Sequence, residues 1–320
     1  MRRPALPQRQ RGAALLVALI IVTLVVTLAA SMVWQQWRAV QVEAAERART
    51  QSLWILQGAL DWARLILRED ARSGRPTALT EPWATPLAEA RLSTFLAADK
   101  DNNAEDGPEA FLSGSITDAQ ARFNLTNLLD PGGKVAQADL EALERLCQTI
   151  GVSESVASRI ATGLRDAQTA GGGTPGSGTA PLRPRNLAQL TWLGVDAATI
   201  ASLEPYVTLL PRRTPVNANT APREVLAAVI KGLDLATAER LVQMRQREPF
   251  KTLGAVEAQI PGLGPLNNQQ VSVLSSFFEV RGRLRLDDRV LEQRSLVERQ
   301  GLDMLVLQRE QVSTVESLRS

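Results

Sequence analysis

The chain of 320 residues contains no histidine, one cysteine and one tyrosine. Without histidine, imidazole acid–base catalysis and the usual imidazole zinc sites are excluded. The single Cys147 excludes an internal disulfide, and its helical spacing in LEALERLCQTIG predicts a buried core position. The sequence also lacks a G-x-S-x-G motif. The composition therefore predicts a chain that is not an enzyme.

The first twelve residues lack acidic side chains and contain four arginines, namely Arg2, Arg3, Arg9 and Arg11. Residues 13–33 then form an uncharged run of 21 residues, long enough as a helix to cross a bilayer core of ~30 Å. The positive-inside rule keeps the leader (residues 1–12) in the cytoplasm and predicts a single-pass inner-membrane protein with a periplasmic bulk. Loss of the leader lowers the formal net charge from +2 to −2, so we expect no nucleic-acid partner.

The leader ends in a charge followed by glycine. Arg11-Gly12 stands directly before Ala13, and this junction resembles the class III leader that prepilin peptidases cut. We therefore expect processing between Gly12 and Ala13. Two alternatives stay open: a secretory signal peptide, for which the apolar run is too long, and an uncleaved signal anchor.

A helical pattern continues from the apolar run through the periplasmic residues 34–72, and Ser73-Gly74-Arg75-Pro76 ends it. After cleavage this single helix would contain about 60 residues and extend for ~90 Å. Such a length is typical of a filament subunit. We expect the helix to pack against partner helices through Ala44, Ala48 and Leu56.

Beyond the helix, we expect residues 73–125 to form the first part of an α/β core, with a strand near 111–116 and a Trp83 side chain that packs inward. Residues 126–269 predict an inserted helical domain, in which the glycine-rich segment 170–186 is expected to be mobile.

After residue 269 the apolar residues tend to recur at every second position, as they do in a strand with one buried face. Residues 270–310 predict the C-terminal part of the core, with strands at 277–286, 289–298 and 302–309. Residues 311–320 are expected to fray.

One acidic segment has the spacing of a metal-binding loop and contains Asp99, Asp101, Asn103 and Glu105. It resembles the opening of an EF-hand loop, but Ala104 replaces the glycine and Ala110 replaces the bidentate glutamate. A solvated acidic turn is the favoured interpretation, and no cofactor is predicted.

Residues 216–264 resemble a helix-hairpin-helix module, in which backbone N–H groups of a glycine hairpin can hold a DNA phosphate. Asp234 replaces a glycine of the first hairpin, so only Gly262-Leu263-Gly264 keeps the pattern. Thr220 is the expected N-cap of the first helix. A structural scaffold is favoured, although five basic residues could still reach a phosphate backbone: Lys231, Arg240, Arg245, Arg247 and Lys251.

Five motifs occur in a specific order: Gln10-Arg11-Gly12, Leu60-Asp61-Trp62-Ala63, Glu81-Pro82-Trp83-Ala84, Asp118-Ala-Gln120-Ala-Arg122-Phe123-Asn124-Leu125 and Val216-Asn217-Ala218-Asn219-Thr220-Ala221. Together they resemble the general secretion protein K family, the minor pseudopilins of bacterial type II secretion systems. The resemblance implies an α+β, pilin-like fold: a long N-terminal helix, transmembrane in its first half, on a small antiparallel sheet with a large inserted all-α domain.

The resemblance also implies a function at the tip of the pseudopilus, where the subunit initiates or caps assembly for export of folded proteins across the outer membrane. The implied partners are the minor pseudopilins I and J, the prepilin peptidase and the inner-membrane assembly platform. A minor pilin of a type IV pilus or of a DNA-uptake apparatus is the alternative, since it would share the leader.

Two positions depart from the pilin pattern or from the family. Val17 stands where pilin-type subunits usually have a glutamate that meets a neighbour's N-terminal amine, and this absence is itself typical of the family. Many members have a calcium-associated Trp-Ile-Asp-x-Asp motif followed by Gly-Ala-Glu. Here the stretch is Gly163-Leu164-Arg165-Asp166-Ala167-Gln168, which keeps only Asp166 as a candidate ligand, so we do not transfer the implied calcium site.

Overall fold

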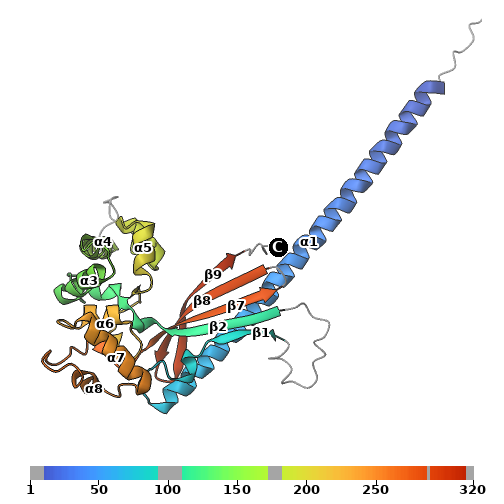
Figure 1. The fold of residues 1–320 in the computed structure, drawn as a ribbon. Helices are drawn as coiled ribbons and strands as arrows, with labels where there is room; N and C mark the ends of the chain where they lie inside the picture. The colour runs from blue at the N-terminus through green and yellow to red at the C-terminus, as the bar shows by residue number, and fades with distance from the viewer. Residues whose placement is uncertain (1–10, 93–109, 172–181, 287–288, 315–320) are drawn as a thin grey trace, which may run out of the picture. The chain divides into compact units, whose positions relative to one another are not determined.

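The computed structural model describes residues 11–92, 110–171, 182–286 and 289–314 (Figure 1). The chain divides into two compact units, Met1–Ile55 and Leu56–Ser320. Helix α1 (Arg11–Ser73) crosses this division and has 63 residues, as the uninterrupted helical pattern predicted.

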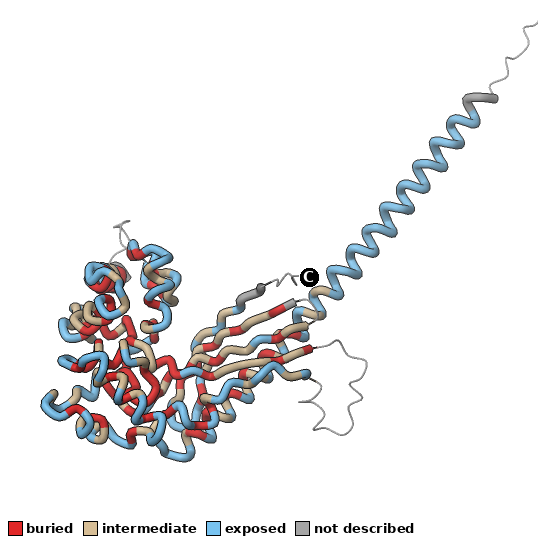
Figure 2. The backbone as a smooth tube through the Cα atoms, in the orientation of Figure 1, coloured by how far each residue is buried: buried red, intermediate tan, exposed pale blue. Residues whose placement is uncertain are grey.

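The first unit contains the N-terminal part of α1. Its large apolar side chains from Leu15 to Val33 are exposed, and Figure 2 shows this stretch in pale blue. The helix is long and apolar enough from Ala14 onwards to cross a membrane, by length and composition. Exposed apolar side chains are what a lipid environment requires of such a helix.

The second unit is built on a five-stranded antiparallel sheet with the strand order β1-β2-β7-β8-β9. The strands are β1 (Leu87–Arg91), β2 (Ala110–Asp118), β7 (Phe277–Leu286), β8 (Arg289–Gln300) and β9 (Asp303–Thr314). The three expected C-terminal strands are confirmed. The expectation of a frayed tail from residue 311 is wrong as far as Thr314, because β9 continues until Thr314 pairs with Val290 near the start of β8.

One face of the sheet packs against the C-terminal part of α1. Leu60, Ala63 and Leu67 of α1 form a buried cluster with strand residues that include Phe278. Trp83, in the short 3₁₀ helix η1 (Pro82–Ala84), joins this cluster as expected, with its ring 5.3 Å from that of Phe278 in an edge-on arrangement. Edge-on aromatic pairs contribute about 0.5–1.5 kcal/mol beyond the burial of their area.

The chain leaves the sheet after Asp118 and returns to it at Phe277, and the intervening residues form the helical insert (Figure 1). Its helices are η3 (Ala119–Ala121), η4 (Leu125–Leu128), α3 (Gln137–Thr149), α4 (Ser155–Gly171), η5 (Leu187–Leu193), α5 (Ala197–Leu203), α6 (Arg223–Val229), α7 (Leu235–Arg247) and α8 (Leu253–Glu257). The insert lies at the end of the sheet where α1 finishes, because Thr77, shortly after α1, donates its backbone N–H to Val273.

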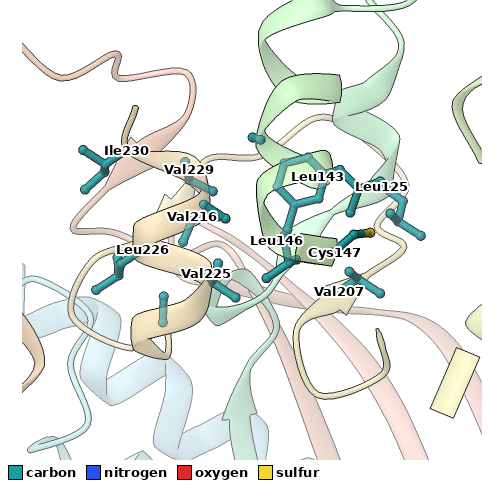
Figure 3. Close-up of a cluster of buried hydrophobic side chains, with 14 of the residues drawn as sticks. Leu125, Leu143, Leu146, Cys147, Val207, Val216, Val225, Leu226, Val229 and Ile230 are labelled. Atoms are coloured by element: carbon teal, nitrogen blue, oxygen red, sulfur yellow. The ribbon is translucent and has the colours of Figure 1, made fainter. Parts of the chain in front are cut away.

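The insert has its own hydrophobic core (Figure 3). Leu143, Leu146 and Cys147 on α3 pack in one cluster with Val225 and Leu226 on α6. Cys147 is therefore a core residue, as its spacing predicted, and burial raises the pKa of its thiol to about 11. A thiol of that pKa stays protonated and is a poor nucleophile.

The insert also differs from the expected pattern in detail. Two pairs of very short parallel strands occur, β3 (Phe123–Asn124) with β4 (Val207–Thr208) and β5 (Val216–Asn217) with β6 (Val271–Ser272). A strand of two residues is too short to show the alternation of apolar and polar residues by which strands are predicted. Helix α4 extends to Gly171, and residues 172–181 of the expected glycine-rich loop lie outside the described residues.

Candidate functional site

Two of the sequence motifs, which begin at Asp118 and Val216, meet where the insert joins the sheet. Asp118, the last residue of β2, is only 4% exposed. Its Oδ2 accepts hydrogen bonds from Asn217 Nδ2 at 3.0 Å, Thr220 Oγ1 at 2.6 Å and Ser275 Oγ at 2.6 Å. Its Oδ1 accepts the backbone N–H of Gln120 at 2.8 Å. One carboxyl group therefore connects three separate stretches of the chain, and we call this site the Asp118 junction.

Burial and hydrogen bonding act in opposite directions on the pKa of Asp118. Burial raises the pKa of Asp118 above its ordinary value, while the hydrogen bonds from Ser275 and Thr220 oppose that rise. A buried polar group is tolerated only when its hydrogen-bonding capacity is filled, and here four donors converge on two oxygens. With both oxygens occupied, the arrangement suits a structural joint rather than a reacting group.

Gln120 fastens the strand that returns from the insert to the sheet. Its Oε1 accepts the backbone N–H of Ser276 at 2.6 Å and that of Phe277 at 3.3 Å. Its Nε2 donates to the backbone carbonyl of Pro215 at 2.9 Å. A single amide side chain thus holds both the entry to β7 and the segment before β5.

The asparagines of the two motifs act in the same way inside the insert. Asn219 exchanges two hydrogen bonds with the backbone of Phe250, each of 2.9 Å. Asn124 donates to the carbonyl of Arg212 and accepts the N–H of Leu210. These side chains replace backbone partners where no regular ladder exists, so the motifs that carry the family resemblance are largely structural.

Thr220 is not the helix N-cap that the sequence predicted. Helix α6 begins at Arg223 with Pro222 as its N-cap residue, and that cap has no side-chain hydrogen bond. The Thr220 hydroxyl donates to Asp118 instead. The hydroxyl group that could have capped the helix locally is therefore bound to a carboxylate 102 positions away in the sequence.

The four residues expected to take part in assembly differ in their exposure. Val17 is exposed, Ala44 is exposed and Ala48 is half-buried. Leu56 is 1% exposed and packs over Gly282, where an added Cβ would lie 3.1 Å from its Cδ2. Our expectation that Leu56 contacts a partner helix is therefore wrong, since this side chain belongs to the protein's own core.

Sequence reasoning missed two exposed apolar side chains on the C-terminal part of α1. Trp62 is 50% exposed and Leu65 is 55% exposed, on the helix that otherwise packs on the sheet. The presence of Trp62 in the Leu-Asp-Trp-Ala motif was the available signal. At the other end of α1, Gly12 and Ala13 lie in the first turn of the helix.

The candidate calcium ligands do not form a site in the described residues. Asp99, Asp101, Asn103 and Glu105 lie outside the described residues. Asp166 is exposed on α4 and accepts hydrogen bonds from Arg165 at 3.1 and 3.2 Å. Residues 167–195 contain no acidic side chain. Within the described ranges, no three histidine, cysteine, aspartate or glutamate side chains are grouped to hold a metal.

Calcium is expected to leave the thermal stability of the insert unchanged, because Ca²⁺ needs 6–8 oxygen ligands and Asp166 offers one ion-paired carboxylate. Melting the detergent-solubilised chain with excess Ca²⁺ or with a chelator should give midpoints within about 1 °C of each other. Asp166→Asn is the matched variant. A calcium-dependent rise that is lost in this variant would contradict the expectation.

Neither hairpin of the helix-hairpin-helix-like segment offers a phosphate site. Asp234 is the N-cap of α7, where its Oδ1 accepts the N–H of Thr237 at 2.8 Å, and this hydrogen bond lowers the pKa of Asp234. A carboxylate thus occupies the position that a phosphate would take. Gly262 and Gly264 have positive φ, but the element that follows them is the strand β6 and not a helix.

Most of the basic side chains of this segment are engaged within the chain. Arg245 is buried and donates to the carbonyl of Ala218. Three others are partnered, Lys231 with Glu141, Arg240 with Thr237 and Lys251 with Glu248. These contacts favour the scaffold interpretation of the segment, which stays a prediction.

An apolar N-terminal helix that continues onto a small antiparallel sheet defines a pilin-like, membrane-anchored, single-pass subunit, here with a helical insert between β2 and β7. Comparison with known proteins refines this class. Two models described as "Type II secretion system (T2SS), protein K" match residues 121–212 and 216–275.

Curated relatives and a solved structure agree with these family models. Type II secretion system protein K of Klebsiella pneumoniae is 30% identical over 94% of this chain and 96% of the relative. The protein of the same name from Pseudomonas aeruginosa is 28% identical over 88% of this chain and 86% of the relative. The chain belongs to the family of type II secretion system protein K.

A solved structure shows the same fold. It is a chain of the GspK-GspI-GspJ complex from the type 2 secretion system of enterotoxigenic Escherichia coli, and it matches with a TM-score of 0.66 and 21% identity. The match covers 84% of this chain and 99% of that chain. Family membership makes the protein a structural pseudopilin and not an enzyme, as the sequence predicted.

Proposed function

We propose that this subunit occupies the tip of a type II secretion pseudopilus, where it initiates or caps the filament that exports folded proteins across the outer membrane. The observation that carries the proposal is the place of the insert. It is fixed by the Asp118 junction at the end of the sheet where α1 finishes. A bulky, firmly attached insert there opposes the stacking of a further subunit beyond that end.

We propose that the minor pseudopilins I and J of the same system are its partners. The GspK-GspI-GspJ complex of the matched structure supports this choice. The exposed Trp62 and Leu65 of α1 are suited to contact a partner helix, because exposed aromatic residues frequently dominate binding energy when buried. Ala44, also exposed, lets a partner helix approach closely.

We propose that the leader remains in the cytoplasm and that α1 anchors the protein in the inner membrane. Prepilin peptidase would cut between Gly12 and Ala13, and the inner-membrane assembly platform would then receive the mature subunit. The arginines of the leader support this orientation. Val17 supports the tip position, because it offers no carboxylate to the amine of a subunit ahead.

Trp62→Glu is expected to reduce co-purification of subunits I and J with the tagged full-length chain by about tenfold or more, because a charge would replace a buried aromatic contact. Trp192→Glu is the matched control, since Trp192 is 47% exposed but lies on η5 of the insert.

Equal loss in both variants, or no loss in Trp62→Glu, would contradict the proposed partner face. The tip position itself is tested by counting copies in sheared pseudopili, where about one copy per filament is expected for a subunit with neighbours on one side only. A copy number near that of the major subunit would refute the tip position.

A further inference from the structure

Two buried carboxyl groups lie where α1 ends and the chain turns towards β1. Asp70, in the last turn of α1, is 8% exposed, and Glu81, just before η1, is 6% exposed. The Glu81 carboxyl group is near enough to Asp70 to raise its pKa. Two like charges buried together are unfavourable unless cations or a proton compensate them.

The hydrogen bonds around this pair leave one oxygen without a partner. Asp70 Oδ2 pairs with Arg299 Nη1 at 2.9 Å. Glu81 Oε2 accepts the backbone N–H of Ala78 at 3.1 Å and the indole N–H of Trp83 at 2.9 Å. Asp70 Oδ1 is buried and has no hydrogen-bond partner among the described residues.

The two cations beside the pair differ in their exposure to solvent. Arg299 on β8 is half-buried, with its side chain 12% exposed, and it also donates to Thr77 Oγ1 at 2.7 Å and to the carbonyl of Ser275 at 2.6 Å. Arg75, on the loop after α1, is 63% exposed and lies 3.9 Å from Glu81 Oε1. One half-buried cation and one mostly solvated cation thus face two buried carboxyl groups. A proton on the buried Asp70 oxygen that has no partner would lower the buried negative charge by one.

We propose that Asp70 holds a proton beside the Glu81 carboxylate in a mildly acidic medium, and that loss of this proton at higher pH loosens the corner between α1 and β1. The proton comes from solvent and occupies Asp70 Oδ1, from which it is donated to a Glu81 oxygen. It fills the one unsatisfied position of the pair. The corner is thereby a pH-responsive element of the fold.

The direction of the effect follows from proton linkage. Burial, and then the charge of Glu81, raise the pKa of Asp70 to about 6, while Arg299 opposes the rise. The folded protein therefore binds more protons than the unfolded chain between the unfolded pKa of about 4 and the folded value. The stabilisation is present in acid and is lost as the pH rises through about 6.

The loosened corner would affect more than one loop. Trp83 packs in the core beneath α1 and donates its indole N–H to Glu81. Arg299 touches Thr77 and Ser275, and Ser275 also donates to Asp118. A change at Asp70 is therefore transmitted to the joint that holds the insert.

Urea unfolding of the detergent-solubilised full chain at about pH 5 and about pH 7.5 tests the proposal. Between these values the unfolding constant of the wild type should rise roughly tenfold more than that of Asp70→Asn, which cannot gain or lose the proton. Glu81→Gln should weaken the dependence without abolishing it, because the burial that raises the pKa of Asp70 remains, and the double variant should lose no more than Asp70→Asn. Glu69→Gln is the control, because Glu69 is adjacent to Asp70 in sequence but exposed.

An Asp70→Asn variant with the pH dependence of the wild type would overturn the proposal. So would a divalent cation that restores stability at about pH 7.5 in the wild type and not in this variant, since the pair would then hold a cation. Carboxyl-carbon NMR titration of Asp70 in the wild type keeps the test valid if a variant fails to fold. Titration of Asp70 below about pH 4 would overturn the proposal as well.

Discussion

Asp118→Ala is expected to lower the free energy of unfolding by about 3–5 kcal/mol, the largest loss we expect from a single substitution in this protein. The hydroxyl groups of Thr220 and Ser275 would lose their short hydrogen bonds to the carboxylate in a buried place. Asn217 would keep the Thr77 carbonyl and Ser275 as acceptors, so it adds little to the loss. The backbone N–H of Gln120 would lose its partner as well. Each buried donor left unpaired costs about 1–3 kcal/mol, so the losses accumulate.

Chemical unfolding followed by circular dichroism measures this loss, with Asp196→Ala as the matched control. Asp196 accepts the N–H of Thr199 at the start of α5, but it is exposed, so its removal should cost only about 1 kcal/mol. Thr220→Val should give an intermediate loss, because Asp118 would keep its other donors. If Asp118→Ala costs no more than Asp196→Ala, the Asp118 junction does not hold the insert in the way we describe.

Gly12→Leu is expected to leave nearly all of the protein as the unprocessed precursor. The resemblance to class III leaders implies that the peptidase accepts only a residue without a side chain before the cut. Gly12 also lies in the first turn of α1, where glycine destabilises a helix by about 1 kcal/mol relative to alanine.

Intact mass and N-terminal sequencing of the membrane-extracted protein decide between the forms. The mature wild type should begin at Ala13, whereas Gly12→Leu should begin at the original N-terminus. Gly58→Ala is the control glycine, since it lies on the same helix and an added Cβ there meets nothing within 4 Å. A wild-type N-terminus near Met32 would instead indicate an ordinary signal peptide and would remove the basis for a filament subunit.

The sequence predicted those parts of the fold that depend on the local spacing of apolar residues and on nearby turn residues. The strand at 277–286 begins and ends where the alternating pattern does, and α1 ends at Ser73, where glycine and proline follow. The buried Trp83 and Cys147 were also predictable from their neighbours in sequence. In each of these cases the residues that decide the outcome lie within a few positions of one another.

The Asp118 junction could not be predicted in the same way. Asp118 resembles a turn residue because its charge suggests exposure, but Asn217, Thr220 and Ser275 bury it from distant positions. Leu56 fits a helix–helix contact as well as a helix–sheet contact, and only the facing Gly282 decides between them. Pairings between distant residues leave no local pattern, so the site appears only once the fold is known.

The position of the insert has a consequence for the order of folding. Asp118 and Phe278 pair directly in neighbouring strands, although the whole insert separates them in the sequence. If β2 and β7 met first, they would have to close a long disordered loop, and that entropy cost grows with loop length. If the insert folds first around its own core, it brings the two strand ends together before they pair. The insert then acts as the turn of a β-hairpin, with β2 and β7 as its two arms.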